Sequence, residues 1–173
     1  LAFDERRVEQ RYAVQLEQSH FPAQADDVVR EVTVGDILRE AAARAPQRDA
    51  LKEVRLDGRI GRVWTYAALL SDSERLARAL LSRHKCGDRI AVWAPNYPEW
   101  VLLEMAAALA GMVLVTANPS LQLREIAYVL RQSRACALYM VESFRGNPIG
   151  EFAREAARAL PALKPVIDLQ DHA

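Results

Sequence analysis

The chain has 173 residues, of which 51% are hydrophobic and 27% are charged. This length and apolar content suit one folded domain with a buried core, and they exclude an intrinsically disordered chain. Lys plus Arg and Asp plus Glu number 23 each, and this balance gives no indication of a basic nucleic-acid surface. The longest apolar stretch, residues 100–115, is interrupted by Glu104 and Gly111, so we expect no membrane span.

The start of the chain and its two cysteines give indications of the cellular compartment of the protein. No charged segment followed by an apolar segment and a cleavage site opens the sequence, so we expect no secretory signal. Cys86 and Cys136 stand apart and outside any C-x-x-C motif, which favours a cytoplasmic protein with reduced thiols. Because the first residue is Leu1 and not Met, we expect a processed product, a trimmed chain or a fragment.

The first part of the sequence predicts two helices. Residues 4–18 carry a thin apolar seam among many charges, which is typical of a surface helix, and residues 20–32 predict an extended lead-in. We therefore treat 1–32 as an N-terminal segment of its own. Thr33 and Asp36 fit the capping box that starts a firmer helix, in which each side chain bonds to the backbone N–H of the other residue.

The remainder, 33–173, predicts one α/β domain. Residues 50–64 indicate a hairpin, with Asp57-Gly58 as a two-residue type I′ turn. Short apolar strands then alternate with helices, which indicates a doubly wound, mostly parallel sheet with helices on both faces. The hairpin would lie at the edge of this sheet or form a small annex. The expected helices span 66–83, 98–110, 121–132 and 149–159, and the expected strands span 89–94, 112–115 and 136–141, with a last strand around Val166, Ile167 and Leu169.

Few residues predict catalytic chemistry. The seven glycines form neither G-x-G-x-x-G nor G-x-x-x-x-G-K-[ST], so neither kind of phosphate loop is present. His84 and Cys86 are close in sequence, but two ligands cannot complete a zinc site and no second pair accompanies them. Cys86 lies in a turn beside Lys85 and Cys136 opens an apolar strand. Neither cysteine has a base partner in the sequence, so we expect both to have structural roles.

Two further groups of residues have both a structural and a functional interpretation. Asn96 and Glu99 follow the strand at 89–94, at the end where doubly wound folds bind ligands. A helix-capping pair explains both residues without a ligand, and we favour that interpretation. A group of aromatic residues offers flat faces on which bases stack, but each lies in or beside an apolar segment, so we predict core packing for Trp64, Tyr66, Trp93, Tyr97 and Trp100.

Four segments carry a likeness to a known family: WTYAAL at 64–69, GDRIAVWAPNYPEW at 87–100, AGMVLVTANPS at 110–120 and EIAYVLRQSRACAL at 125–138. In length and order they resemble the N-terminal part of the ATP-dependent acyl-CoA synthetases, within the adenylate-forming superfamily of AMP-binding enzymes. The resemblance extends from about Thr33 to Leu169. The sequence around Asn118 looks more like fatty-acyl and medium-chain acyl-CoA ligases than like amino-acid-activating modules.

The resemblance implies a reaction for the parent enzyme. Mg-ATP converts a carboxylic acid, here of the fatty type, to an acyl-adenylate and pyrophosphate, and CoA then gives the thioester and AMP. The family's Ser/Thr/Gly-rich phosphate loop ending in Lys is expected soon after residue 173, with the adenine, ribose and Mg²⁺ motifs and the catalytic Lys further on. We therefore assign no catalytic, cofactor-binding or metal-binding residue to this chain, and we expect it to be inactive alone.

The resemblance also sets the expected partners. The parent would bind a carboxylic acid, ATP and CoA, whereas this chain alone would bind none of the cofactors and would self-associate through an apolar surface that the rest of the enzyme covers. The alternative is a stand-alone doubly wound binding or interaction module without catalysis. A receiver-like module needs an Asp at a strand end, where this chain has Ala94-Pro95-Asn96, and a flavodoxin-like one needs a hydroxyl-rich loop that is missing.

Overall fold

The structure is a computed structural model that describes residues 30–55 and 57–171. The chain divides into two compact units, Leu1–Glu31 and Val32–Ala173, and the second unit holds every described helix and strand. The predicted N-terminal helix and nearly all of its extended lead-in lie outside the described residues. The domain limits expected from the sequence therefore stay a prediction.

A four-stranded parallel sheet with the order β4-β3-β5-β6 forms the centre of the second unit. Its strands are β3 (Arg89–Trp93), β4 (Val113–Ala117), β5 (Ala137–Met140) and β6 (Val166–Asp168). The two central strands, β3 and β5, are buried along their length except at Arg89, which explains why they are apolar without alternation. The doubly wound parallel sheet that the sequence predicts is confirmed.

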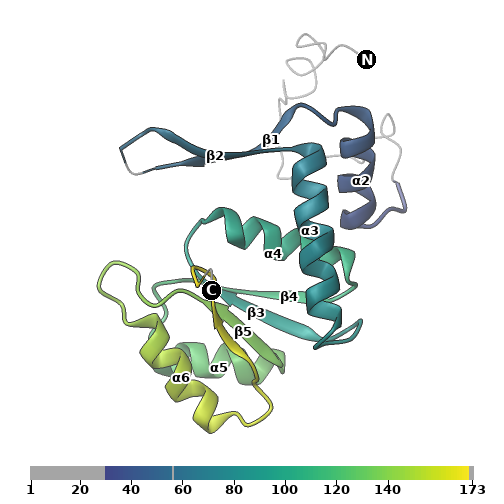
Figure 1. Ribbon diagram of the computed structural model, residues 1–173. Coiled ribbons are helices and arrows are strands. Elements are labelled where there is room, and N and C mark those ends of the chain that lie inside the picture. The colour runs from purple at the N-terminus through teal and green to yellow at the C-terminus, as the bar shows by residue number, and fades with distance from the viewer. Residues whose placement is uncertain (1–29, 56, 172–173) are drawn as a thin grey trace, which may run out of the picture. The chain divides into compact units, whose positions relative to one another are not determined.

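Helices cover both faces of this sheet (Figure 1). On one face lies α4 (Pro98–Leu109), packed against α3 (Tyr66–Leu81) and α2 (Val34–Arg44). On the other face lie α5 (Leu123–Ser133) and α6 (Ile149–Ala159). Because α4 lies between the sheet and two other helices, it is apolar on most sides, in contrast to the amphipathic surface helices.

Local signals at the helix ends behave as the sequence predicts. The Thr33 hydroxyl accepts the Asp36 backbone N–H at 3.1 Å, and the Asp36 carboxylate accepts the Thr33 N–H at 3.1 Å, which is the reciprocal capping box of α2. Gly111 has a φ of 67° directly after the end of α4, so it supplies the left-handed residue with which many helices end.

The hairpin, β1 (Asp49–Val54) and β2 (Ile60–Thr65), forms a two-stranded antiparallel sheet separate from the main sheet. Of the two predicted positions, the annex is therefore correct. The predicted two-residue turn is wrong, because Arg55 N–H donates to the Arg59 carbonyl at 2.9 Å across three residues. A three-residue loop needs one residue of positive φ, and Gly58 supplies it with a φ of 80°.

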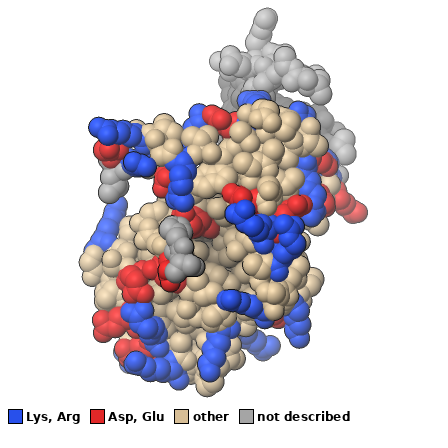
Figure 2. All heavy atoms as spheres, viewed as in Figure 1, with Lys and Arg blue, Asp and Glu red and all other residues tan. Residues whose placement is uncertain are grey.

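The buried core is continuous from the sheet into the helices on both of its faces. Its largest fully buried apolar side chains are Trp93, Ile90, Leu103, Ile126, Leu130, Leu138, Ile149, Leu163, Val92 and Val141. On the face shown in Figure 2, acidic and basic side chains are interspersed among polar and apolar ones, consistent with the balanced charge of the sequence. Within the described part of the chain, no helix is long and apolar enough to cross a membrane.

Candidate functional site at the carboxyl edge of the sheet

The loops that follow β3, β4 and β5 meet at the carboxyl edge of the sheet. From this edge, the loop after β3 leads to α4 and the loop after β5 leads to α6, on opposite faces of the sheet. Ligands of open α/β sheets bind where neighbouring strands diverge in this way. The loops that meet there are 94–97 after β3, 118–122 after β4 and 141–148 after β5.

A cavity of about 1130 Å³ lies between this edge and the hairpin. The half-buried rings of Tyr97, Trp100 and Phe144 form much of its apolar wall, and they also pack on the core. Charged groups from the hairpin, Glu53 and Arg55, stand at its rim. A large and mainly apolar cavity of this kind fits an apolar ligand, or an apolar surface of a neighbouring domain.

Arg62 joins the hairpin to the start of α4 beside this cavity. Its guanidinium donates to both carboxylate oxygens of Glu53, each at 3.1 Å, and to the carboxylate of Glu99. These hydrogen bonds lower the pKa of Glu53 to about 2 and raise the pKa of Arg62. The guanidinium carbon also lies 5.3 Å from the centre of the Trp64 ring. The cluster therefore links the hairpin to the start of α4 beside the cavity.

The predicted capping pair of Asn96 and Glu99 is wrong. Helix α4 begins at Pro98, and its N-cap is Tyr97, which makes no side-chain capping bond. A residue before proline is restricted to extended backbone, and Tyr97 has a φ of −109° and a ψ of 155°. The helix therefore starts one residue too late for the pair to form. Asn96 is exposed at the cavity rim, and Glu99 is held by Arg62.

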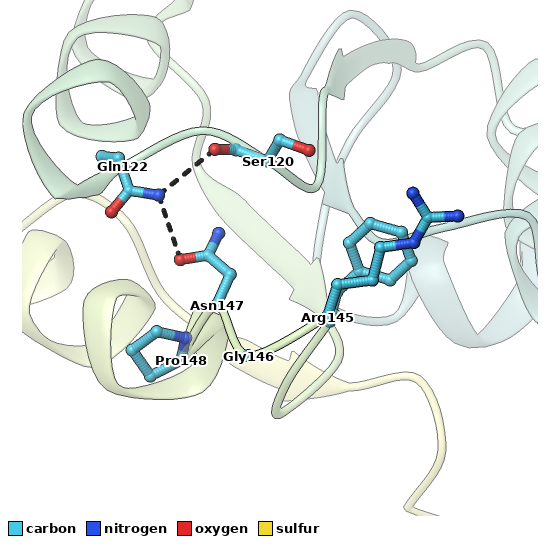
Figure 3. Close-up of a pocket in the computed structure, with 7 residues that line it drawn as sticks. Ser120, Gln122, Arg145, Gly146, Asn147 and Pro148 are labelled. Carbon is cyan, nitrogen blue, oxygen red and sulfur yellow. Dashed lines mark hydrogen bonds between the residues drawn. The ribbon is translucent and has the colours of Figure 1, made fainter.

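A second cavity, of about 350 Å³, lies between the loops after β4 and β5 (Figure 3). Asn147 crosses between these loops, because its Nδ2 donates to the carbonyls of Pro119 at 2.9 Å and Leu121 at 3.0 Å. Its Oδ1 accepts from Nε2 of Gln122 at 3.3 Å, and the same Nε2 lies 3.3 Å from the Ser120 carbonyl. The polar groups of this cavity thus bond mainly to one another.

The loop after β5 places a positive charge between the two cavities. Arg145 and Gly146 have φ angles of 47° and 82°, and the backbones of Phe144 and Asn147 exchange hydrogen bonds at 2.8 and 3.1 Å. The exposed Arg145 lines both cavities and lies over the Phe144 ring at 5.1 Å. Sequence reasoning missed Arg145 and Asn147, although Gly146 and the Asn147-Pro148 dipeptide do signal a tight loop.

Two polar groups at this edge are bound by other residues of the chain. Glu142, the first carboxylate after β5, is bound by both terminal nitrogens of Arg154 at 2.8 and 3.0 Å, which lowers the pKa of Glu142. The Asn118 carbonyl accepts the indole N–H of Trp93 at 2.9 Å. Both groups are thus engaged by contacts within the chain.

The cysteine and histidine candidates lie near the opposite, amino edge of the sheet. His84 Nδ1 is 3.7 Å from Cys136 Sγ, whereas Cys86 Sγ donates to the Gly111 carbonyl at 3.3 Å. The fold therefore pairs His84 with Cys136 and not with its sequence neighbour Cys86. Burial and the nearby Asp88 carboxylate raise the pKa of the Cys136 thiol, which keeps it protonated and weakly nucleophilic.

The aromatic residues largely follow the core-packing prediction. Trp93 has no exposed surface, and Tyr97 and Trp100 pack against the core with their other sides in the large cavity. Trp64 is half-buried, and its indole N–H donates to the Asp72 carboxylate at 3.0 Å. None of these residues is arranged with its neighbours as an exposed stacking platform for bases.

A parallel β4-β3-β5-β6 sheet with helices on both faces and an antiparallel hairpin beside α4 defines the N-terminal subdomain of an adenylate-forming enzyme. Residues 38–172 match the AMP-binding enzyme family, and the chain belongs to that family. This finding confirms the resemblance seen in the sequence, and it rests on most of the described chain and not on a single motif.

Individual relatives agree with this assignment. Human mitochondrial medium-chain acyl-CoA ligase ACSF2 is 38% identical over 138 residues, which is 76% of this chain and 22% of that protein. Acetoacetyl-CoA synthetase from Streptomyces lividans is 26% identical, with a TM-score of 0.73, over 82% of this chain and 23% of that one. The N-terminal subdomain of Klebsiella oxytoca NpsA is 28% identical, with a TM-score of 0.58, over 67% of this chain and 29% of that one. The chain thus spans less than a quarter of the length of curated relatives such as ACSF2.

Proposed function

We propose that this chain is the N-terminal α/β part of an acyl-CoA ligase that activates a carboxylic acid, of the fatty type, with ATP and joins it to CoA. The observation that carries the proposal is the family match over residues 38–172, together with 38% identity to a medium-chain acyl-CoA ligase. The large cavity beside Trp100 could hold either an apolar acid or an apolar surface of a neighbouring domain. It is compatible with this class of enzyme but does not indicate the length of the acyl chain.

The chain alone is proposed to be inactive. Its 173 residues contain no Ser/Thr/Gly-rich loop ending in Lys, and the polar groups at the carboxyl edge bond to one another. ATP, Mg²⁺ and CoA would therefore be held mainly by other parts of the enzyme. The two cysteines are free thiols, which is consistent with a reducing compartment. We therefore propose that the enzyme is cytoplasmic. Fractionation of cells that express the full-length protein would test this location.

The test compares two proteins in the same ATP–pyrophosphate exchange assay, with saturated carboxylic acids of increasing length. The full-length enzyme is expected to exchange pyrophosphate with at least one acid and to form its CoA thioester. The 173-residue chain is expected to give no exchange above a no-enzyme blank. A full-length enzyme that activates no carboxylic acid would contradict the ligase, and turnover by the short chain would contradict its inactivity.

We also propose that the isolated chain self-associates through the hairpin. Val54, Ile60 and Val63 are 65%, 55% and 45% exposed there, next to the rim of the large cavity, and the rest of the enzyme would cover them. Sedimentation should show concentration-dependent association that Val54→Glu weakens. Tyr128→Glu is the matched control, since Tyr128 is 62% exposed on α5. A monomer at all concentrations, or equal effects of both changes, would refute this interface.

A further inference from the structure

Three side chains with metal-binding atoms converge at the amino edge of the sheet. His84 follows the end of α3, Asp88 precedes β3, and Cys136 precedes β5. One ligand atom of each, an imidazole nitrogen, a carboxylate oxygen and the sulfur, lies within 4.8 Å of the other two. All three side chains are partly buried, so the group is accessible to an ion from solvent but shielded on its inner side.

The spacing of these atoms suits a tetrahedral zinc ion. With Zn–S of about 2.3 Å, Zn–N of about 2.0–2.1 Å and a tetrahedral angle, sulfur and nitrogen should be about 3.6 Å apart. The measured distance between Cys136 Sγ and His84 Nδ1 is 3.7 Å. The Asp88 oxygen lies within 4.8 Å of both other ligand atoms, so it has to approach by at most about 1.3 Å to reach the corresponding tetrahedral distance of roughly 3.5 Å.

The backbone holds the three residues in place without an ion. Cys136 N–H donates to the Arg89 carbonyl at 2.8 Å, which fixes the start of β5 beside the residue that follows Asp88. His84 N–H donates to the Leu80 carbonyl at 2.8 Å, so its position is set by the last turn of α3. One oxygen of Asp88 accepts the Lys85 N–H at 2.9 Å, which orients the carboxylate.

The imidazole of His84 also lacks conventional partners. Nδ1 faces the sulfur at 3.7 Å, and Nε2 is buried with no hydrogen-bond partner among the described residues. The His84 ring lies near the Cys136 thiol, a weak hydrogen-bond partner, and near the Asp88 carboxylate, so coordination of an ion through Nδ1 would give the ring a stronger interaction than it has without one.

We propose that His84, Asp88 and Cys136 bind one Zn²⁺ ion with water as the fourth ligand. On binding, the Cys136 thiol loses its proton to solvent and becomes a thiolate ligand. The resulting donor set of nitrogen, oxygen and thiolate sulfur matches the preferences of Zn²⁺ and disfavours Mg²⁺ and Ca²⁺, which take oxygen ligands. Bound there, the ion joins the start of β3 to the start of β5, at the edge of the sheet opposite to the candidate ligand site. The site does not depend on the proposed ligase activity.

The test uses the tag-free 173-residue chain and Co²⁺, a spectroscopically visible substitute for Zn²⁺. We expect one Co²⁺ per chain, with a thiolate-to-cobalt charge-transfer band that excess Zn²⁺ removes. Cys136→Ser should abolish the band and weaken Zn²⁺ affinity, measured by chelator competition, at least about tenfold. Cys86→Ser is the matched control and should change neither. A missing band in the wild-type chain, or a band that survives Cys136→Ser, would overturn the proposal.

A second measurement covers the case in which Cys136→Ser does not fold. The chain has two cysteines, so Cys86→Ser leaves Cys136 as the single thiol. Zn²⁺ should slow the reaction of this thiol with a disulfide reagent at least about tenfold, and a chelator should restore the rate. Adding His84→Ala to Cys86→Ser should remove the protection. An equal rate with and without Zn²⁺ in the folded protein would refute the site.

Discussion

Replacing Asn147 by aspartate tests whether its side chain holds the two site loops together. The carboxamide donates to two backbone carbonyls, of Pro119 at 2.9 Å and Leu121 at 3.0 Å. Asn147→Asp keeps the size of the side chain, but an ionised carboxylate has no hydrogen to donate and turns its oxygens towards carbonyl oxygens. The change therefore removes both bonds and adds electrostatic repulsion, with almost no change in packing.

The magnitude follows from the bonds lost. Two hydrogen bonds of about 0.5–1.5 kcal/mol each give a loss of about 1–3 kcal/mol in the free energy of unfolding at pH 7. Facing the two carbonyls, the new carboxyl group has a folded-state pKa above its unfolded value of about 3.9. The repulsive part of the loss is therefore absent below about pH 3.9 and grows as the pH rises through the folded pKa, while a neutral carboxyl can donate to one carbonyl.

Urea unfolding followed by far-UV circular dichroism, at pH 7 and at pH 3.5, measures both effects. Asn96→Asp is the matched control, because Asn96 is exposed on the neighbouring loop and makes the same change in charge. We expect a loss at pH 7 for Asn147→Asp alone, and a smaller loss at pH 3.5. If the two variants differ by less than about 0.5 kcal/mol at pH 7, or if the difference is the same at both pH values, the role assigned to Asn147 is wrong.

Three further predictions concern other parts of the fold. The Arg62 guanidinium lowers the pKa of Glu53 from 4.5 to about 2, so its stabilising contribution is complete above pH 4.5 and is lost as the pH falls towards 2; Glu53→Gln should flatten the dependence of Tm on pH in that interval. Gly111→Ala should lower the unfolding free energy by about 1–2 kcal/mol in urea, because φ is 67° and the new Cβ would lie 2.7 Å from Cys86 Sγ; wild-type stability would contradict this. Leu138→Ala, at a position with no exposed surface, should cost about 2–5 kcal/mol by the same measurement, and a cost below 1 kcal/mol would mean that the site is not packed as described.

The succession of strands and helices could be predicted because each element carries its own signal. Strands β3 and β5 are apolar along their length because helices cover both of their faces, and this burial is visible in the sequence as a run without alternation. The capping box of Thr33 and Asp36 is equally local, since the two residues bond to each other and to nothing distant. Such features depend on neighbours within a few residues.

The candidate site could be predicted less well because its contacts are distant in sequence. Asn96 and Glu99 have the spacing of a capping pair, but Pro98 sets the helix start and Arg62 binds Glu99 from 37 positions away. His84 and Cys136, 52 positions apart, meet through the register of β3 and β5, which the sequence does not display. The sequence therefore indicated some residues that line the large cavity, such as Tyr97 and Trp100, but not the contacts that arrange them.

The separate hairpin affects how ligands should be docked into the large cavity. Strands β1 and β2 share no ladder of hydrogen bonds with the main sheet, and a two-stranded sheet is marginally stable by itself. One wall of the 1130 Å³ cavity therefore depends on a side-chain clamp, Arg62 with its two carboxylates, while the other wall is continuous with the core. When an apolar ligand is docked into this cavity, the side formed by β3 and β5 should accordingly be held fixed and the position of the hairpin should be allowed to vary.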